Sequence, residues 1–390
     1  MKRMLRNMFD NLNKKTAKGT KLHWLHSTVE AFESFTFVSK NTAASGAHLR
    51  DAIDMKRAMS LVIIALVPAL LFGIFNVGYQ HYLSCGETIK EVGFWAMFGY
   101  GLLKVVPMIV VSYVVGLGIE FAFAQRRGHE VNEGYLVTGM LIPLICPPDV
   151  PLWMLAIAVA FAVIIGKEIF GGTGMNFLNP ALVARAFLFF SYPSQMSGDV
   201  VWIADKADAV SGATSLGEMM TGSVLPSSSL LDMFLGFTPG SVGETSAVAI
   251  LLGAALLLIT GIASWRVMLS VFVGGALMGI TFNLFGTNAY MNLPFYYHFL
   301  MGGFLFGAVF MATDPVTSSQ TNTGKYIYGL LIGMMAVLIR VVNPAYPEGM
   351  MLAILLMNVF APLIDYFVVQ ANIRRRTNRW KANADNKEMK

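Results

Sequence analysis

The chain has little charge: of its 390 residues, only 13% are Asp, Glu, Lys or Arg. Because a soluble domain carries about 25% charged residues, this composition excludes an ordinary water-soluble enzyme. A disordered chain is excluded as well, since 55% of the residues are hydrophobic and 12% are aromatic. The mean hydropathy of +0.60 indicates a protein whose solvent is the lipid bilayer.

Cysteine is also scarce, with Cys85 and Cys146 lying far apart in the chain. Two such thiols cannot build a four-thiolate iron–sulfur cluster or a structural zinc site. The 6 histidines show no ligand spacing. We therefore expect no resident metal or haem, and we expect both thiols to be bystanders.

Positive charge gathers at the two ends of the chain. Residues 1–57 hold 11 Lys or Arg against 5 Asp or Glu, residues 371–390 hold 7 against 2, and the stretch between them holds 10 against 16. Basic segments that flank apolar spans follow the positive-inside rule, so we expect cytoplasmic termini and no nucleic-acid partner. Residues 1–57 lack the apolar core of a signal peptide and are expected to persist.

About ten apolar runs approach the roughly 20 residues that a helix needs to cross the hydrocarbon core. The sequence therefore predicts an all-α, polytopic membrane protein, with the third and fifth runs shorter than a full crossing. The predicted spans are Met59–Tyr79, Val105–Phe123, Gly134–Ile145, Leu152–Ile165, Pro180–Tyr192, Ser246–Ala263, Val267–Phe285, Tyr296–Ala312, Tyr326–Val341 and Met350–Val369.

Charge orients these spans. With a cytoplasmic start, Arg126, Arg266, Lys325 and the cluster at Arg374 all fall on the cytoplasmic side. The polar stretch after the fifth span, in which Lys206 is the one basic residue, falls on the outer face. We divide the chain into a basic arm (1–57), a first membrane repeat (58–192), an outer loop (193–245), a second membrane repeat (246–370) and a basic tail (371–390).

Two pairs of motifs predict an internal repeat. The tripeptide Asn-Pro-Ala begins at Asn179 before the fifth span and at Asn343 before the tenth. Nearly the same spacing separates Asp149 from Asp314, each of which lies next to a proline. The members of each pair fall on opposite membrane sides, which predicts two inverted five-helix repeats with broken helices near the midplane. The alternative is that Asn-Pro-Ala only begins a helix, with Asn as the cap and Pro at the first position.

A paired Asn-Pro-Ala also occurs in aquaporin-type channels, which are a rival from another functional class. Such channels have a shorter chain with six full spans and an arginine directly after the second motif. Here Tyr346 follows the second motif, which argues against a channel.

The most specific local motif, Asp208-Ala-Val-Ser211-Gly212-Ala213-Thr214, lies in the outer loop. Small residues leave the Thr214 hydroxyl uncrowded, and Gly212 tolerates turn conformations. The motif resembles the acceptor sites of flavin transferases, although from the residues alone it could be a Ser/Thr turn without chemistry.

From about Asp51 to Arg375 the chain resembles the family formed by the B subunits of the sodium-translocating NADH:quinone oxidoreductases. The resemblance rests on seven stretches, which are His129–Gly134, Lys167–Gly174, Asn176–Leu182, Arg185–Phe190, Ser211–Thr214, Met311–Val316 and Arg340–Met350.

The resemblance implies a membrane flavoprotein with two flavins. Thr214 would carry FMN as a phosphoester, on the outer side where the transferase works. Riboflavin without a covalent bond would lie near Asn176, Asn179 and Asp314, whose polar groups suit the flavin's pyrimidine edge. Electrons from NADH would arrive through FAD and iron–sulfur centres on sister subunits and leave to ubiquinone, coupled to sodium export across the bacterial inner membrane. The partners would be the five other subunits of the complex (A, C, D, E and F).

Ionisable residues inside spans cost about 2.5 to 3.5 kcal/mol each and mark pathways or pairs. The resemblance links Glu120 and Asp365 to sodium uptake, whereas the alternative is that they pair with nearby cations or lie at the interface. We expect Lys167, Glu168 and Arg185 to form structural pairs.

Gly116, with Gly118, partly resembles the family's quinone-site segment. Small residues in a span more often mark close helix packing, and we favour packing here. The nearest rival within the family is the D subunit of the Rnf ferredoxin:NAD oxidoreductase complex. The basic N-terminal arm favours the quinone-reducing enzyme, and quinone-dependent NADH oxidation by the purified complex would separate the two.

Overall fold

The computed structural model describes residues 2–16, 29, 33, 37, 45–47, 55–127, 134–207, 211–223, 225–343 and 348–388, and within these ranges the chain is helical with no strand. This confirms an all-α, polytopic membrane protein. The helices that are long and apolar enough to cross a membrane number 6: α3 (Met55–Ser84), α5 (Phe94–Arg127), α7 with η2 (Leu152–Phe170), α12 (Trp265–Phe285), α15 (Asn322–Val342) and the first part of α16 (Met350–Glu388).

Shorter apolar helices complete the bundle: α6 (Tyr135–Ile145), α8 (Pro180–Ser191) and α11 (Ala247–Ile259). Pro143 lies in the last turn of α6, and Pro180 is the first residue of α8. Since proline interrupts a helix interior but suits its first position, these residues explain why both helices are too short to cross the bilayer. Both had been predicted as short spans.

The eighth predicted span, Tyr296–Ala312, is not one helix. It is divided into α13 (Tyr297–Leu300), α14 (Phe304–Phe306) and a π-helical turn, η4 (Gly307–Met311). Gly302 has a φ of +59° between α13 and α14, a left-handed conformation that glycine adopts without strain. The chain therefore breaks at this glycine.

Helix packing repeats between the two halves of the chain. In the first half α5 packs on α7 and α7 on α8, and in the second half α12 packs on α15 and α15 on α16. The halves meet where α3 packs on α11 and α8 on α16. Gly253 approaches Ala65 while Ser246 lies near Phe72, so α3 and its counterpart α11 run in opposite directions, as an inverted repeat requires.

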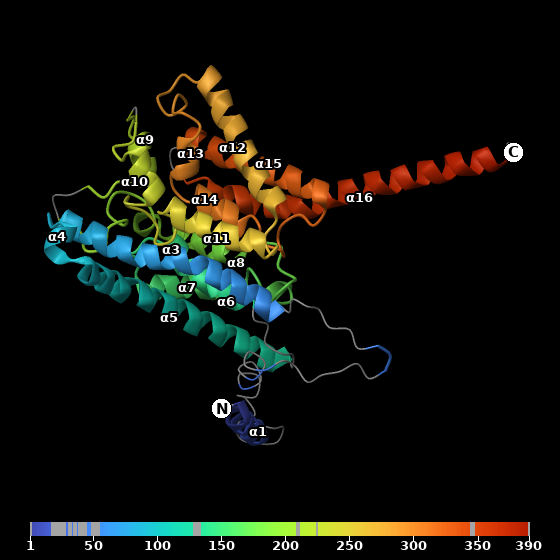
Figure 1. Cartoon of the computed structure of the whole chain (residues 1–390), viewed down its shortest axis with the longest axis horizontal. Coiled ribbons are helices and arrows are strands. Elements are labelled where there is room, and N and C mark those ends of the chain that lie inside the picture. Colours follow the sequence, from blue (N-terminus) through green and yellow to red (C-terminus); the bar gives the residue numbers. More distant parts are fainter. Residues whose placement is uncertain are drawn as a thin grey trace.

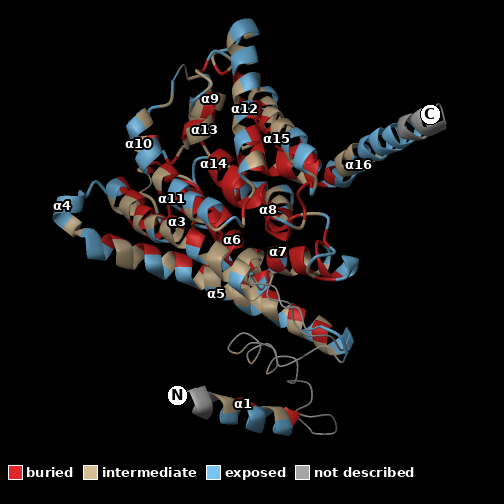
Figure 2. Ribbon diagram, turned by 45° about the vertical axis from the view of Figure 1, so that its right-hand side comes forward, coloured by how far each residue is buried: buried red, intermediate tan, exposed pale blue. Residues whose placement is uncertain are grey.

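The two ends of the bundle differ in charge and in shape. Figure 1 shows α4 (Ile89–Val92), α9 (Ser215–Met220) and α10 (Leu230–Leu235) at one end, and the Arg127 end of α5 and the projecting part of α16 toward the other. The sequence predicted the last span to stop at Val369, but the helix continues to Glu388. Figure 2 shows this projecting part exposed, while buried residues gather where α6, α7, α8 and α14 lie. Neither α1 (Lys2–Thr16) nor the short helices α9 and α10 had been predicted.

Candidate functional site

Thr214 borders a hollow of about 880 Å³ next to the short helices α9 and α10. It is the N-cap residue of α9, and its Oγ1 accepts a hydrogen bond of 3.2 Å from the Gly217 amide. The side chain is half-buried. Thr214 therefore lines an open hollow together with polar residues such as Ser241 and Thr245.

The segment before Thr214 is fastened by its backbone. The Gly212 amide donates a 3.2 Å hydrogen bond to the carbonyl oxygen of Asp199. A Cβ atom at position 212 would lie 2.6 Å from that oxygen, so any larger residue would force the two loop segments apart. Ser211 is exposed, and its hydroxyl accepts a bond from the Ala213 amide. Asp208 lies outside the described residues.

The outer loop is also fastened to α5, a feature that sequence reasoning missed. Asp205, whose φ is +46°, accepts hydrogen bonds from Lys104 at 2.7 Å and from the Tyr100 hydroxyl at 2.8 Å. These bonds hold the pKa of the Asp205 carboxyl below its usual range. Left-handed backbone at a residue other than glycine is uncommon and often marks a functional site.

Three charged side chains form the floor of the hollow beside Thr214. The Arg185 guanidinium, on α8, pairs with Glu244 at 2.7 Å and with Glu348, and it donates to the Ser241 hydroxyl at 3.3 Å. Arg185 and Glu244 are buried. This confirms the expected structural pairing of Arg185. The Arg185–Glu348 pair joins the first half of the chain to the second half.

Arg340 is fully buried next to this floor. Its guanidinium donates to the backbone carbonyls of His298 at 2.6 Å, Met301 at 2.9 Å and Glu348 at 2.9 Å. These carbonyls belong to the broken eighth span and to the loop before α16. Arg340 therefore satisfies polar backbone groups that an unbroken helix would have bonded itself.

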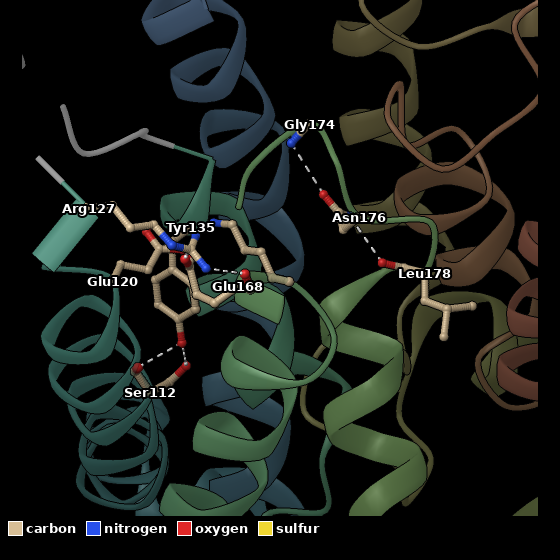
Figure 3. Close-up of polar contacts among 9 residues, drawn as sticks. Ser112, Glu120, Arg127, Tyr135, Glu168, Gly174, Asn176 and Leu178 are labelled. Carbon is tan, nitrogen blue, oxygen red and sulfur yellow. Dashed lines mark hydrogen bonds and ion pairs between the residues drawn. The ribbon is translucent and has the colours of Figure 1, made fainter. Parts of the chain in front are cut away.

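A second hollow, of about 860 Å³, is bordered by Asn176, Asn179 and Asp314. The structure thus brings together the three residues that had been grouped from the sequence. Asn176 accepts from the Gly174 amide at 3.3 Å and donates to the Leu178 carbonyl at 3.0 Å (Figure 3).

The other two residues of this group shape the backbone at the same hollow. Asn179 caps α8, because its side-chain oxygen accepts from the Ala181 amide at 3.0 Å. Asp314 accepts from the Val316 amide at 3.1 Å and from the Thr317 hydroxyl at 2.9 Å. The helix-cap alternative for Asn179 is therefore confirmed as a structural role.

Two ion pairs lie beside this second hollow. Glu120, on α5, pairs with Lys167, and both side chains are 4% exposed. Arg127 binds Glu168 with one nitrogen on the carboxylate at 2.9 Å and another on the backbone carbonyl at 2.7 Å (Figure 3). The expected pairing of Lys167 and Glu168 is confirmed.

The other acidic candidate, Asp365 on α16, lies at the start of α15 instead. Its carboxylate accepts from the Ser319 hydroxyl at 2.7 Å, from the Gln320 amide at 2.7 Å, and from the amide and hydroxyl of Thr321. Asp365 thus caps the loop that leads into α15. Across the described parts of the chain, no three His, Cys, Asp or Glu side chains gather closely enough to hold a metal ion.

Gly116 packs against an aromatic ring. A Cβ at this position would lie 1.9 Å from the ring of Tyr135, whose hydroxyl donates to the Ser112 carbonyl at 2.9 Å (Figure 3). Gly118 faces open space. Gly116 is therefore a packing glycine, the interpretation that the sequence favoured.

Comparison with known proteins identifies the family of the chain. Residues 42–374 match the family model described as the NQR2, RnfD, RnfE family. The chain is 49% identical over 398 aligned positions to the B subunit of the Na(+)-translocating NADH-quinone reductase of Chromohalobacter salexigens, with 96% of each chain covered. It is 47% identical to the protein of the same name from Azotobacter vinelandii, with 96% of this chain and 99% of that one covered. The chain belongs to the NQR2, RnfD, RnfE family.

Proposed function

We propose that the chain is the B subunit of a sodium-translocating NADH:ubiquinone reductase. It would pass electrons from FMN on Thr214 through riboflavin to ubiquinone, coupled to sodium export. The observation that carries the proposal is Thr214, which lines a hollow at the outer loop in a chain whose relatives bear that subunit's name. A bound flavin supplies one- and two-electron redox chemistry, and the chain positions it and tunes its surroundings.

The hollow at Thr214 fits a flavin. The hydroxyl of Thr245, which borders the hollow, is buried and has no hydrogen-bond partner among the described residues. A buried polar atom without a partner is costly, and a polar ligand in the hollow would supply that partner. Thr214 would hold the phosphate, and Gly212 would keep the segment close to the loop wall.

The second hollow fits a non-covalent polar ligand such as riboflavin. Asn176, Asn179 and Asp314 place amide and carboxylate groups around its edge. Pro180 borders this hollow, whereas Arg185 and Phe189 of the same helix α8 border the first. At about 1.5 Å per residue, 7 to 14 Å of helix separates the two hollows. Two cofactors held there would be near neighbours.

Sidedness supports the same proposal. The Thr214 hollow lies beside α9, toward the opposite end of the bundle from the projecting basic part of α16 (Figure 1). The positive-inside rule puts the basic end in the cytoplasm. Thr214 would then be outside the inner membrane, within reach of a flavin transferase, and both termini would be cytoplasmic. Subunits A, C, D, E and F would be the partners.

Sodium and quinone are assigned to other parts of the chain. Glu120 and Asp365 supply the hard oxygen ligands that sodium prefers, and we propose them for the sodium pathway. The quinone would bind near Gly116 on α5. Since Gly116 packs on Tyr135, it would shape that site through helix spacing.

In-gel flavin fluorescence after denaturation tests the covalent flavin. The wild-type chain, matured with its transferase, should give a fluorescent band, and Thr214→Val should give none. Thr221→Val is the matched control, because Thr221 is a nearby threonine whose hydroxyl bonds only locally, to the Glu218 carbonyl. A band of normal strength in Thr214→Val would overturn the assignment.

The same family contains the Rnf subunits, so membership of a ferredoxin:NAD oxidoreductase is the second candidate. The NADH-quinone reductase name of relatives that cover 96% of this chain favours the quinone enzyme. Oxidation of NADH by quinone in the purified complex decides between them. An aquaporin-type channel would show no fluorescent band at all.

A further inference from the structure

Lys167 lies between two parts of the proposed function. Its ammonium pairs with the Glu120 carboxylate, and the same side chain borders the hollow of Asn176 and Asp314. Both members of the ion pair are 4% exposed. A lysine buried between a candidate sodium carboxylate and a candidate flavin hollow needs an explanation beyond packing.

The two neighbouring carboxylates are neutralised in different ways. Glu168 is held by the rigid, planar fork of Arg127, which also binds the Glu168 backbone (Figure 3). Glu120 is held by a lysine, a single point charge at the end of a flexible four-carbon chain. The Glu168–Arg127 pair is therefore the more rigid of the two, whereas the Glu120–Lys167 pair can open by rotation of the Lys167 side chain.

The residues around the Lys167 ammonium include an aromatic ring and a second carboxylate. The Lys167 ammonium lies 5.8 Å from the centre of the Tyr135 ring, a cation–π contact that does not depend on the Glu120 carboxylate. Asp314 borders the same hollow and has no ion pair within the described part of the chain. In their ionised forms, Glu120, Asp314 and Lys167 together carry two negative charges and one positive charge. One further cation makes the trio neutral.

We propose that the Lys167 ammonium is a tethered competitor for sodium at Glu120. Sodium binds the carboxylate as the ammonium turns into the hollow toward Asp314, and the ammonium returns when sodium leaves. No covalent bond forms or breaks, and the trio changes from a net charge of −1 to zero. This inference rests on the proposed role of Glu120 in the sodium pathway.

The test measures the half-saturating sodium concentration and the maximal rate of quinone reduction in the assembled complex. Lys167→Met removes the competitor, so the half-saturating concentration should fall by about tenfold or more. Lys167→Arg should raise it, because a guanidinium binds a carboxylate through two parallel hydrogen bonds. Opposite shifts from two substitutions at one position cannot come from general loss of folding.

Glu168→Gln is the matched control. It removes the neighbouring buried carboxylate but leaves Lys167 on Glu120, so it should shift the half-saturating sodium concentration much less than either Lys167 variant does. The inference is overturned if both Lys167 variants change the maximal rate alone, or if Lys167→Met weakens the response to sodium. If Lys167→Met does not assemble, sodium binding to the Lys167→Arg complex is measured by ²³Na NMR in the absence of turnover. Weaker binding than in the wild type supports the inference, and unchanged binding refutes it.

Glu120→Gln separates this inference from the proposal beneath it. If that variant keeps the wild-type response to sodium, Glu120 is not in the sodium pathway and the proposed role itself fails. If Glu120→Gln loses the response and neither Lys167 variant shifts it, only the competitor role of Lys167 fails.

Discussion

Gly212→Ala should greatly slow attachment of flavin to Thr214 without preventing membrane insertion. The new Cβ would lie 2.6 Å from the Asp199 carbonyl oxygen, whereas ordinary contacts begin at 3.4 Å. The two loop segments must therefore separate by roughly 0.8 Å. This movement breaks the 3.2 Å hydrogen bond from the Gly212 amide to Asp199.

The cost can be worked out from these two changes. Overpacking costs about 1 to 3 kcal/mol, and a lost backbone hydrogen bond costs about 0.5 to 1.5 kcal/mol. A sum near 3 kcal/mol lowers the population of the presented segment by about a hundredfold or more. With limiting transferase, the rate of flavin attachment should fall by a similar factor, because the transferase acts on that population.

Gly217→Ala is the matched control on the other side of Thr214. Its Cβ would lie 3.6 Å from the Thr214 hydroxyl, an ordinary contact, and alanine favours helix α9 over glycine by about 1 kcal/mol. The assay is the fluorescence of the denatured band per unit of protein over a time course of maturation. Equal early rates for Gly212→Ala and the wild type would refute the reasoning.

Two further substitutions test packing inside the membrane. Gly116→Ala places a Cβ within 1.9 Å of the Tyr135 ring and should lower the free energy of unfolding by about 1 to 3 kcal/mol, which is measured as a lower melting temperature in detergent. Gly118→Ala is the control, because Gly118 faces open space and its substitution should leave the melting temperature unchanged. A loss of quinone reduction by Gly116→Ala at an unchanged melting temperature would contradict the packing role. Arg185→Met leaves two carboxylates without their guanidinium and should destabilise the chain by about 3 to 5 kcal/mol. A melting temperature equal to that of the wild type would show that the ion pairs of Arg185 do not hold the two halves of the chain together.

Much of the fold was predictable because lipid imposes a simple rule on sequence. A run of apolar residues broken by proline or charge marks a span, and α6, α7 and α8 end within about two residues of the predicted limits. Periodic motifs predicted the inverted halves. The short α8 follows directly from the proline that begins it.

The broken eighth span could not be predicted from the same rule. Its sequence is apolar except for His298. The break at Gly302 is stabilised by Arg340, which lies about forty residues further along the chain and donates to carbonyls of that span. Likewise, Arg185 finds its partners 59 and 163 residues away. A charged residue within a span indicates an ion pair or an ion pathway. The identity of its distant partner depends on tertiary packing, which no local sequence pattern predicts.

The role of Asn179 shows why a structural and a functional interpretation of one residue need not compete. The cap of α8 uses only the side-chain oxygen, which accepts from the Ala181 amide. An asparagine amide nitrogen carries two further hydrogen atoms, which the cap does not require, and the residue borders the second hollow. The residue that begins the broken helix therefore keeps a donor group that the proposed ligand of that hollow would use. A motif that starts a half-helix inside a membrane is thus suited to binding. At such a helix end, side chains make the hydrogen bonds that a continuous helix would make with its own backbone, and these side chains retain polar atoms for a second partner.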